Sequence, residues 1–221
     1  AVQSAPHVPT DVLRTGCDFF VCSAYKFFGP HMGILWGRRE VLEQLEPYRV
    51  RPAPTELPWC FEPGTQNHEG MAGTAAAVDY FAWVGETLAP ADAAVEGPTE
   101  RARNIHAAFD YLFAHELELT RQLIDGLEAM PGVKIHGITD RDALDRRVST
   151  VSFTAGSRTP SEIASALAGR NIFCWSGHNY ALEIARDLGI EKTGGAVRIG
   201  AVHYNTPAEI DVVLNAIEDV L

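Results

Sequence analysis

The sequence is poor in lysine and carries no excess of positive charge. Its only lysines are Lys26, Lys134 and Lys192, and the formal net charge is −11. A protein that holds a nucleic-acid backbone needs a basic surface, because affinity depends on neutralised phosphates. The charge balance therefore argues against a nucleic acid as partner.

Long apolar runs and closely paired cysteines are also missing. No run of about 18 apolar residues is present, so we expect no membrane-spanning helix. No basic segment followed by an apolar one opens the sequence, as it would in a secretory signal. The four cysteines, Cys17, Cys22, Cys60 and Cys174, show neither CxxC spacing nor an accompanying histidine cluster, so we expect no metal site. These absences predict a cytoplasmic protein with reduced thiols and no membrane partner.

What is present is an alternation of short apolar runs with longer segments of helical spacing. The 221 residues, 46% of them hydrophobic, could form one large domain or two small ones. Strands are predicted over residues 17–25, 33–37, 133–138, 147–154, 172–175 and 196–202. Helices are predicted over residues 38–48, 70–88, 99–130, 159–170, 180–190 and 206–221. Residues 49–70 are a predicted loop, and residues 89–98 are a predicted linker. This order indicates an α/β or α+β fold, with an antiparallel sheet after Pro131 that carries helices on one face.

Local residues support several of these helices. Thr159 and Thr206 each precede a proline, so both are predicted N-caps. The stretch around Ala76, Tyr80 and Trp83 is rich in small residues and has helical spacing, which predicts a buried helix.

Lys26 is the first residue that could carry chemistry, because aromatic residues stand on both sides of it. Partial desolvation of its amine would lower the pKa, and a neutral amine is what Schiff-base chemistry with an aldehyde needs. Gly29 and Gly33 would let the backbone approach a bound group closely, and Ser23 could offer a hydroxyl to a phosphate. The alternative is a lysine at a strand end whose amine reaches water.

Two further stretches of the sequence could each either bind a ligand or serve the fold alone. "FEPGTQNHEGMAG", residues 61–73, could place N–H groups and the Thr65 hydroxyl on a phosphate, or it could be an ordinary Pro-Gly turn before a helix. Arg198 lies in a short apolar strand after two glycines. It could form a salt bridge, or it could bind a substrate carboxylate through both of its terminal nitrogens.

The combination of these stretches resembles a known family. "SAYKFFGPHMGILWG", "FEPGTQNHEGMAG" and "VRIGAVHYNTPAEID", in this order, are similar to the class V aminotransferases, which are fold-type-I pyridoxal-phosphate enzymes. The sequence looks closest to the branch of cysteine desulfurases and selenocysteine lyases. The resemblance implies that residues 1–98 form the C-terminal part of the large, pyridoxal-phosphate-binding domain. Residues 99–221 then form a long linking helix and a small C-terminal α/β domain.

The resemblance also implies a role for individual residues around pyridoxal 5'-phosphate. Lys26 matches the lysine that forms the internal aldimine with the cofactor. Ser23 matches a phosphate ligand, and Gln3 matches the residue that hydrogen-bonds the phenolic oxygen of the cofactor. Tyr25 stands where the family usually has histidine, and its phenol can still donate to a phosphate.

Partner and substrate follow from the resemblance as well. Thr65 matches the residue that reaches the phosphate of the other subunit, which implies a homodimer. Arg198 matches the arginine that clamps the α-carboxylate of the substrate. The implied function is a pyridoxal-phosphate-dependent enzyme that acts on a small amino acid and is desulfurase-like or aminotransferase-like. The alternative is a non-catalytic, truncated remnant that serves as a dimerisation or assembly partner.

The sequence departs from the family in two respects. Members of the family are roughly twice as long, so we expect this chain to be a fragment. By resemblance, the missing N-terminal half would carry a phosphate loop, a ring stacked on the pyridine and an aspartate at the pyridinium nitrogen. Desulfurases also carry a catalytic cysteine in a loop like "GHHCA", and here the loop is "GHNYA", with Tyr180 in its place. Trp175 stands near where a substrate-side arginine is common, and Cys174 lies in an apolar run typical of a buried thiol.

Overall fold

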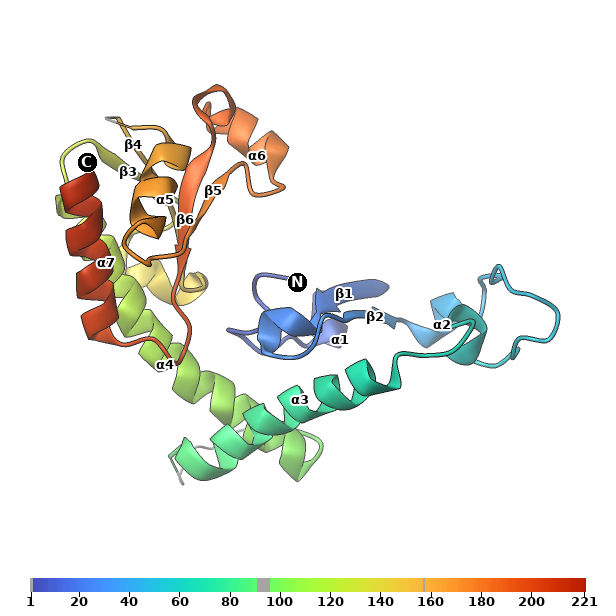
Figure 1. Ribbon diagram of the computed structural model, residues 1–221. Helices are drawn as coiled ribbons and strands as arrows, with labels where there is room; N and C mark the ends of the chain where they lie inside the picture. The colour runs from blue at the N-terminus through green and yellow to red at the C-terminus, as the bar shows by residue number, and fades with distance from the viewer. Residues whose placement is uncertain (1, 91–95, 157) are drawn as a thin grey trace. The chain divides into compact units, whose positions relative to one another are not determined.

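The computed structural model describes residues 2–90, 96–156 and 158–221 and contains two compact units, Ala1–Tyr111 and Leu112–Leu221 (Figure 1). The mixed α/β fold predicted from the sequence is confirmed. The predicted linker falls largely on residues 91–95, which lie outside the described residues. The domain boundary at residues 98 and 99 stays a prediction.

The first unit contains a two-stranded antiparallel hairpin. β1 (Phe19–Ser23) pairs with β2 (Gly33–Gly37), and the 3-10 helix η1 (Ala24–Phe27) connects them. Two short helices flank the hairpin, α1 (Val12–Thr15) before it and α2 (Arg39–Leu42) after it. Both predicted strands are thus confirmed, and the helix predicted after the second strand is shorter than expected.

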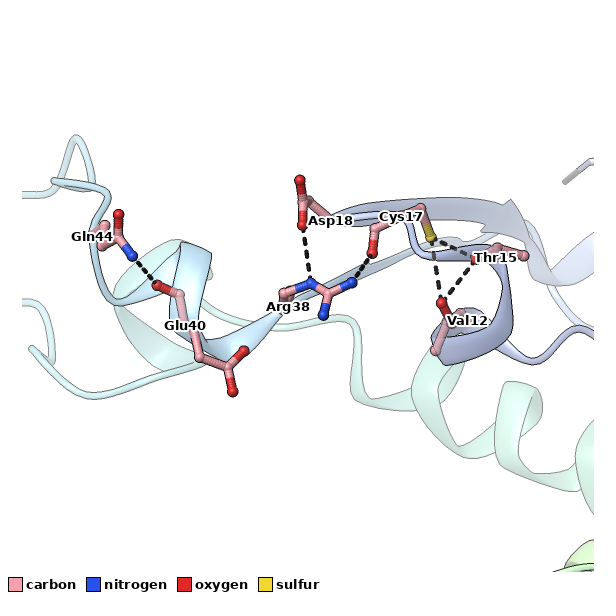
Figure 2. A network of polar contacts seen from close by, with 7 residues as sticks. All are labelled: Val12, Thr15, Cys17, Asp18, Arg38, Glu40 and Gln44. Carbon is pink, nitrogen blue, oxygen red and sulfur yellow. Dashed lines mark hydrogen bonds and ion pairs between the residues drawn. The ribbon is translucent and has the colours of Figure 1, made fainter.

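Polar contacts tie α1 to the open end of the hairpin, as Figure 2 shows. Arg38 Nε donates to Asp18 Oδ1 over 2.9 Å, and its terminal nitrogen donates to the Cys17 carbonyl over 3.2 Å. The Cys17 sulfur lies 3.0 Å from the Thr15 hydroxyl, which donates to the carbonyl of Val12. A single arginine therefore joins both strands to the turn that follows α1.

The long helix α3 (His68–Leu88) begins at Asn67, whose side chain accepts a hydrogen bond from Gly70 N over 2.9 Å. The helix is confirmed, but it is buried on one side only, so the prediction of a buried helix is wrong for its other side. Tyr80 is 36% exposed and Trp83 52% exposed, whereas Phe81 and Val84, one position further along the helix, are buried. α3 has small or apolar residues on several sides, so its spacing alone did not identify the side that packs.

α3 packs against the start of α4 (Glu100–Ala129). The rings of Phe81 and Phe109 stack with their centroids 4.9 Å apart. A Cβ atom at Gly85 would lie 1.7 Å from the Asn104 carbonyl oxygen, so only glycine permits this approach. Between α2 and α3 the chain is loop, as predicted, apart from the 3-10 turn η2 (Trp59–Phe61).

The second unit is built on a four-stranded antiparallel sheet in the order β3-β4-β6-β5. Its strands are β3 (Val133–His136), β4 (Thr150–Ala155), β5 (Trp175–Gly177) and β6 (Ala196–Gly200). The antiparallel sheet after Pro131 is confirmed. β5 begins at the last residue of its predicted range, because Ile172 N bonds to the Leu167 carbonyl and so ends the preceding helix.

Helices α5 (Pro160–Ala168), α6 (Leu182–Asp187) and α7 (Pro207–Val220) complete this unit, with 3-10 turns η3 (Arg141–Arg146) and η4 (Glu191–Thr193). α5 and α7 both begin with a capping box. Thr159 and Thr206 accept a hydrogen bond from the backbone N–H three residues on, and Glu162 and Glu209 accept one from the cap in return. Both predicted N-caps are confirmed.

The core of the second unit lies on one face of the sheet. Fully buried side chains from α4, the strands and the helices meet there, including Leu123, Phe153, Ile163, Val197 and Ile217. Burial of each such side chain contributes about 1.5–3 kcal/mol to stability. Within the described residues, none of the helices combines the length and the apolar character that a membrane crossing requires.

Candidate functional site

The turn that carries Lys26 is held firmly between the two strands of the hairpin. Ala24 is fully buried, and its N–H donates to the Met32 carbonyl over 2.7 Å. Phe28 adopts a left-handed φ of 70°, which ends η1, and Gly29 N then donates to the Ala24 carbonyl. Lys26 therefore lies on a short turn whose two ends are fixed by backbone hydrogen bonds.

The Lys26 side chain is half-buried. Its Nζ lies 5.3 Å from the centroid of the Tyr25 ring, and within the part of the chain that the structure describes it makes no hydrogen bond or ion pair. The aromatic surroundings are uneven, because Phe27 is buried while Phe19 and Phe28 are 45% and 38% exposed. Lys26 is neither enclosed nor fully in water, and its amine is available to a ligand.

Ser23 and Tyr25 share this turn with Lys26. Ser23 is the N-cap residue of η1 but makes no capping bond through its side chain, so its hydroxyl is available to another acceptor or donor. Tyr25 is 46% exposed and meets His31 edge to face, with ring centroids 5.0 Å apart. Three of the predicted cofactor residues thus lie within four positions of the chain.

Gln3 and Thr65 lie on other segments of the same unit, and both are exposed. Gln3 is in the turn that opens the chain, and Thr65 follows Gly64, whose φ of 87° is left-handed. Among the described residues, no hydrogen bond, ion pair or ring contact joins either of them to Lys26. Their predicted roles stay predictions.

Arg198 lies in the middle of β6 in the second unit, opposite Ser152 of β4 and Trp175 of β5. It is half-buried, and across the described ranges its guanidinium has no hydrogen-bond or ion-pair partner. The other partly buried arginines differ: Arg38 and Arg121 bind carboxylates, and Arg147 donates to backbone carbonyls. The salt-bridge alternative for Arg198 therefore has no support among the described residues.

Two glycines bring the strand of Arg198 close to β5. Gly194 and Gly195 have left-handed φ values of 92° and 80°, and a Cβ atom at Gly195 would lie 2.2 Å from the backbone of Gly177. No other residue fits at Gly195, because the backbone conformation and the contact both exclude a side chain.

The "GHNYA" loop follows β5 and displays Tyr180. Asn179 and Tyr180 both have left-handed φ values, 54° and 61°, which non-glycine residues adopt rarely. Asn179 donates to the Gly177 carbonyl over 3.1 Å, and Tyr180 N donates to His178 Nδ1 over 3.2 Å. The Tyr180 side chain is 97% exposed at the tip of this loop.

The nearby thiol is poorly suited to act as a nucleophile. Burial raises the pKa of Cys174, which keeps it in the thiol form, whereas the thiolate is the reactive species. All four cysteines of the chain are free of disulfides.

An apolar cavity of about 270 Å³ in the first unit was not predicted from the sequence. Its lining includes Phe20, Cys22, Phe27, Phe81 and Phe109. Burial raises the pKa of the Cys22 thiol. None of the predicted site residues lines this cavity, although Phe27 of the Lys26 turn does. The alternation of Phe20 and Cys22 along β1 is the only signal in the sequence for an inner apolar wall.

Comparison with known proteins gives the family of this chain. Residues 1–94 and 90–213 match the model of the class-V aminotransferases. The chain therefore belongs to the class-V aminotransferase family, as the three stretches of sequence predicted.

Its relatives are named as cysteine desulfurases. A "Probable cysteine desulfurase" of Streptomyces coelicolor is 30% identical over the whole chain, and one of Halalkalibacterium halodurans is 28% identical over 98% of it. The chain spans 49% and 48% of these two proteins, which is consistent with the expected missing half. These names do not favour the alternative of a non-catalytic remnant.

Solved structures agree with this assignment. The apo structure of a cysteine desulfurase from Thermococcus onnurineus NA1 matches all of this chain with a TM-score of 0.80 and 25% identity, over 51% of its own length. The cysteine desulfurase CsdA from Escherichia coli matches 99% of the chain with a TM-score of 0.74 and 25% identity, over 50% of its length.

Proposed function

We propose that the full-length protein is a pyridoxal-phosphate-dependent enzyme that acts on a small amino acid in a desulfurase-like or aminotransferase-like reaction. The observation that carries the proposal is the Lys26 turn in a member of this family. A half-buried amine, which has no polar partner among the described residues, lies there on the same turn as Ser23 and Tyr25.

The residues of this turn suit the chemistry of the cofactor. Pyridoxal phosphate offers an aldehyde, which Lys26 Nζ would hold, and a phosphate, to which Ser23 and Tyr25 would donate. A Cβ atom at Gly33 would meet nothing within 4 Å, so the backbone there leaves space for a bound group. When bound, the cofactor supplies an electron sink that stabilises negative charge at the substrate's α-carbon.

The chain's own residues would orient the substrate and move its proton. Arg198 would bind the α-carboxylate through a bidentate contact, which fixes the direction of the α-carbon. Lys26 Nζ would take the α-proton as a base and return it as an acid.

We also propose a cytoplasmic homodimer. The segment before Thr65 supports an interface with a second copy, because Tyr48, Val50 and Trp59 are 104%, 66% and 52% exposed there. In such a dimer Thr65 would reach the phosphate bound by the partner subunit.

Borohydride reduction tests the proposed function. The full-length protein is incubated with pyridoxal phosphate, reduced and digested, and its peptides are mapped by mass spectrometry. We expect the pyridoxyl mass on the peptide that contains Lys26, and its loss in Lys26→Ala. A label on Lys134 or Lys192, or no label, would contradict the proposal.

A further inference from the structure

Four side chains form a row across the sheet of the second unit. His136 lies opposite Ser152, Ser152 opposite Arg198, and Arg198 opposite Trp175. Directly opposed residues of antiparallel strands project from the same face. The neighbouring residues Val151, Phe153 and Val197 belong to the core, so the row lies on the other face of the sheet.

Arg198 and Trp175 are neighbours in the row, and they combine a cation with an aromatic ring. Cβ atoms of directly opposed residues lie about 4.5–5.5 Å apart. A carboxylate bound by the guanidinium would therefore leave the rest of its molecule within reach of the indole. Trp175 is 59% exposed, so its ring is not committed to the core.

Two exposed aromatic residues stand near Trp175 in the sequence. Phe173 and Tyr180, which precede and follow it on the same stretch of chain, are 83% and 97% exposed. The row contains no carboxylate, and Arg198 is its only permanent cation. A second carboxylate on the ligand would meet an indole in place of a cation, while an apolar side chain would lose water-exposed surface against it.

We infer that Trp175 determines the substrate's side chain, and that the substrate is an α-amino acid with an apolar or aromatic side chain of about the size of leucine or phenylalanine. The inference rests on the proposed function. It deepens that function by assigning the carboxylate to Arg198 and the side chain to the Trp175 indole.

Among the described residues, the lack of an exposed thiol on the loop after β5 agrees with the inference. The loop after β5 presents the Tyr180 phenol at its tip, and Cys174 is half-buried. A substrate that transfers no sulfur needs no protein thiol at this place.

Ligand binding and turnover together test the inference on the full-length enzyme with its cofactor. Dissociation constants are measured calorimetrically for 3-phenylpropionate and propionate, which have no amino group and undergo no reaction. We expect Trp175→Ala to weaken 3-phenylpropionate about tenfold and propionate less than twofold, because the apolar contact is lost while Arg198 remains. The ratio of kcat/KM for phenylalanine to that for alanine should fall about tenfold as well.

Trp83→Ala is the matched control, because Trp83 is similarly exposed and lies in the other unit. It should change neither the affinity for 3-phenylpropionate relative to propionate nor the ratio of kcat/KM for phenylalanine to that for alanine. If Trp175→Ala does not fold, Trp175→Gln removes the ring at similar length. Unchanged 3-phenylpropionate binding and an unchanged kcat/KM ratio would overturn the inference, as would higher turnover of cysteine or aspartate than of phenylalanine by the unmodified enzyme.

The failure of the two proposals can be told apart. If the pyridoxyl label is absent from Lys26 but Trp175→Ala still weakens 3-phenylpropionate selectively, the proposed function fails and the binding role of Trp175 stands. If the label is on Lys26 and the selectivity is unaffected, only the role of Trp175 fails.

Discussion

Arg198 is a charged side chain that the chain places at the centre of a sheet without giving it a counter-charge among the described residues. Taking a guanidinium partly out of water without a partner costs free energy, which a bound carboxylate would return. The sequence alone left a structural and a substrate-binding role open. In the structure, the residues opposite Arg198 are Ser152 on β4 and Trp175 on β5. Neither of them offers the carboxylate that a structural salt bridge requires.

We predict that Arg198→Ala raises KM for an amino-acid substrate far more than it weakens cofactor binding. A hydrogen bond to a charged group is worth about 1.5–3 kcal/mol, which corresponds to one to two decades in affinity. Steady-state kinetics and a cofactor titration of the full-length enzyme measure the two effects. Arg146→Ala, an exposed arginine on η3, serves as the control and should change neither. Equal loss of cofactor from Arg198→Ala and Lys26→Ala would refute the clamp role.

The secondary-structure elements differ in how far the sequence determines them. Helices α5 and α7 were predicted from their Thr-Pro starts, because a capping box is decided by residues three positions apart. The side of α3 that packs was not predicted, since Tyr80 and Phe81 are both large aromatic residues and the sequence does not show which of them contacts α4. The row through Arg198 was also beyond prediction, because strand register depends on residues far apart in sequence.

At α7 the capping box makes stability depend on pH. The Thr206 N–H and hydroxyl donate to Glu209 over 2.7 and 3.1 Å, and these hydrogen bonds lower the pKa of Glu209 below its ordinary value of 4.5. A lowered carboxyl pKa stabilises the fold above pH 4.5, and this contribution is lost as the pH falls through the pKa in the folded state.

We therefore expect Glu209→Gln to reduce the Tm of the full-length protein near neutral pH and to flatten its decline on acidification. Thermal unfolding followed by circular dichroism between about pH 3 and pH 6 measures both effects. Glu218→Gln, on the same helix and outside the capping box, is the control. If Glu209→Gln and the unmodified protein lose stability in parallel below pH 4.5, the pH dependence arises elsewhere.

At the scale of the whole molecule, the chain spans about half the length of its relatives, and the hairpin of the first unit has an uncovered apolar face. Val21 of β1 lies opposite Leu35 of β2, and these side chains are 54% and 64% exposed, with Phe19 at 45%. A two-stranded sheet also leaves both of its edges without a neighbouring strand. We expect residues from the rest of the polypeptide to cover this face.

The 221-residue chain by itself should bind pyridoxal phosphate weakly or not at all and should be prone to aggregation. An imine on Lys26 alone is reversed by water, and the resemblance assigns the phosphate loop, the ring stack and the pyridinium carboxylate to the other half. Visible absorption during titration with pyridoxal phosphate, with and without that half, measures the difference. A saturable band at micromolar cofactor with the 221-residue chain alone would show that the main cofactor contacts are misplaced.

The crossing of α3 and α4 at Gly85 has a mechanical consequence. Glycine lowers the stability of a helix interior by about 1 kcal/mol relative to alanine, but any side chain here would collide with the Asn104 carbonyl. Sliding α3 by one residue would bring Val84 or Glu86 to that carbonyl, so the contact fixes the register of the two helices at this point. Through Phe81 and Phe109 they form one wall of the apolar cavity. The fit of a molecule in this cavity would therefore depend on β1 and on the segment around Val8, which form its other walls.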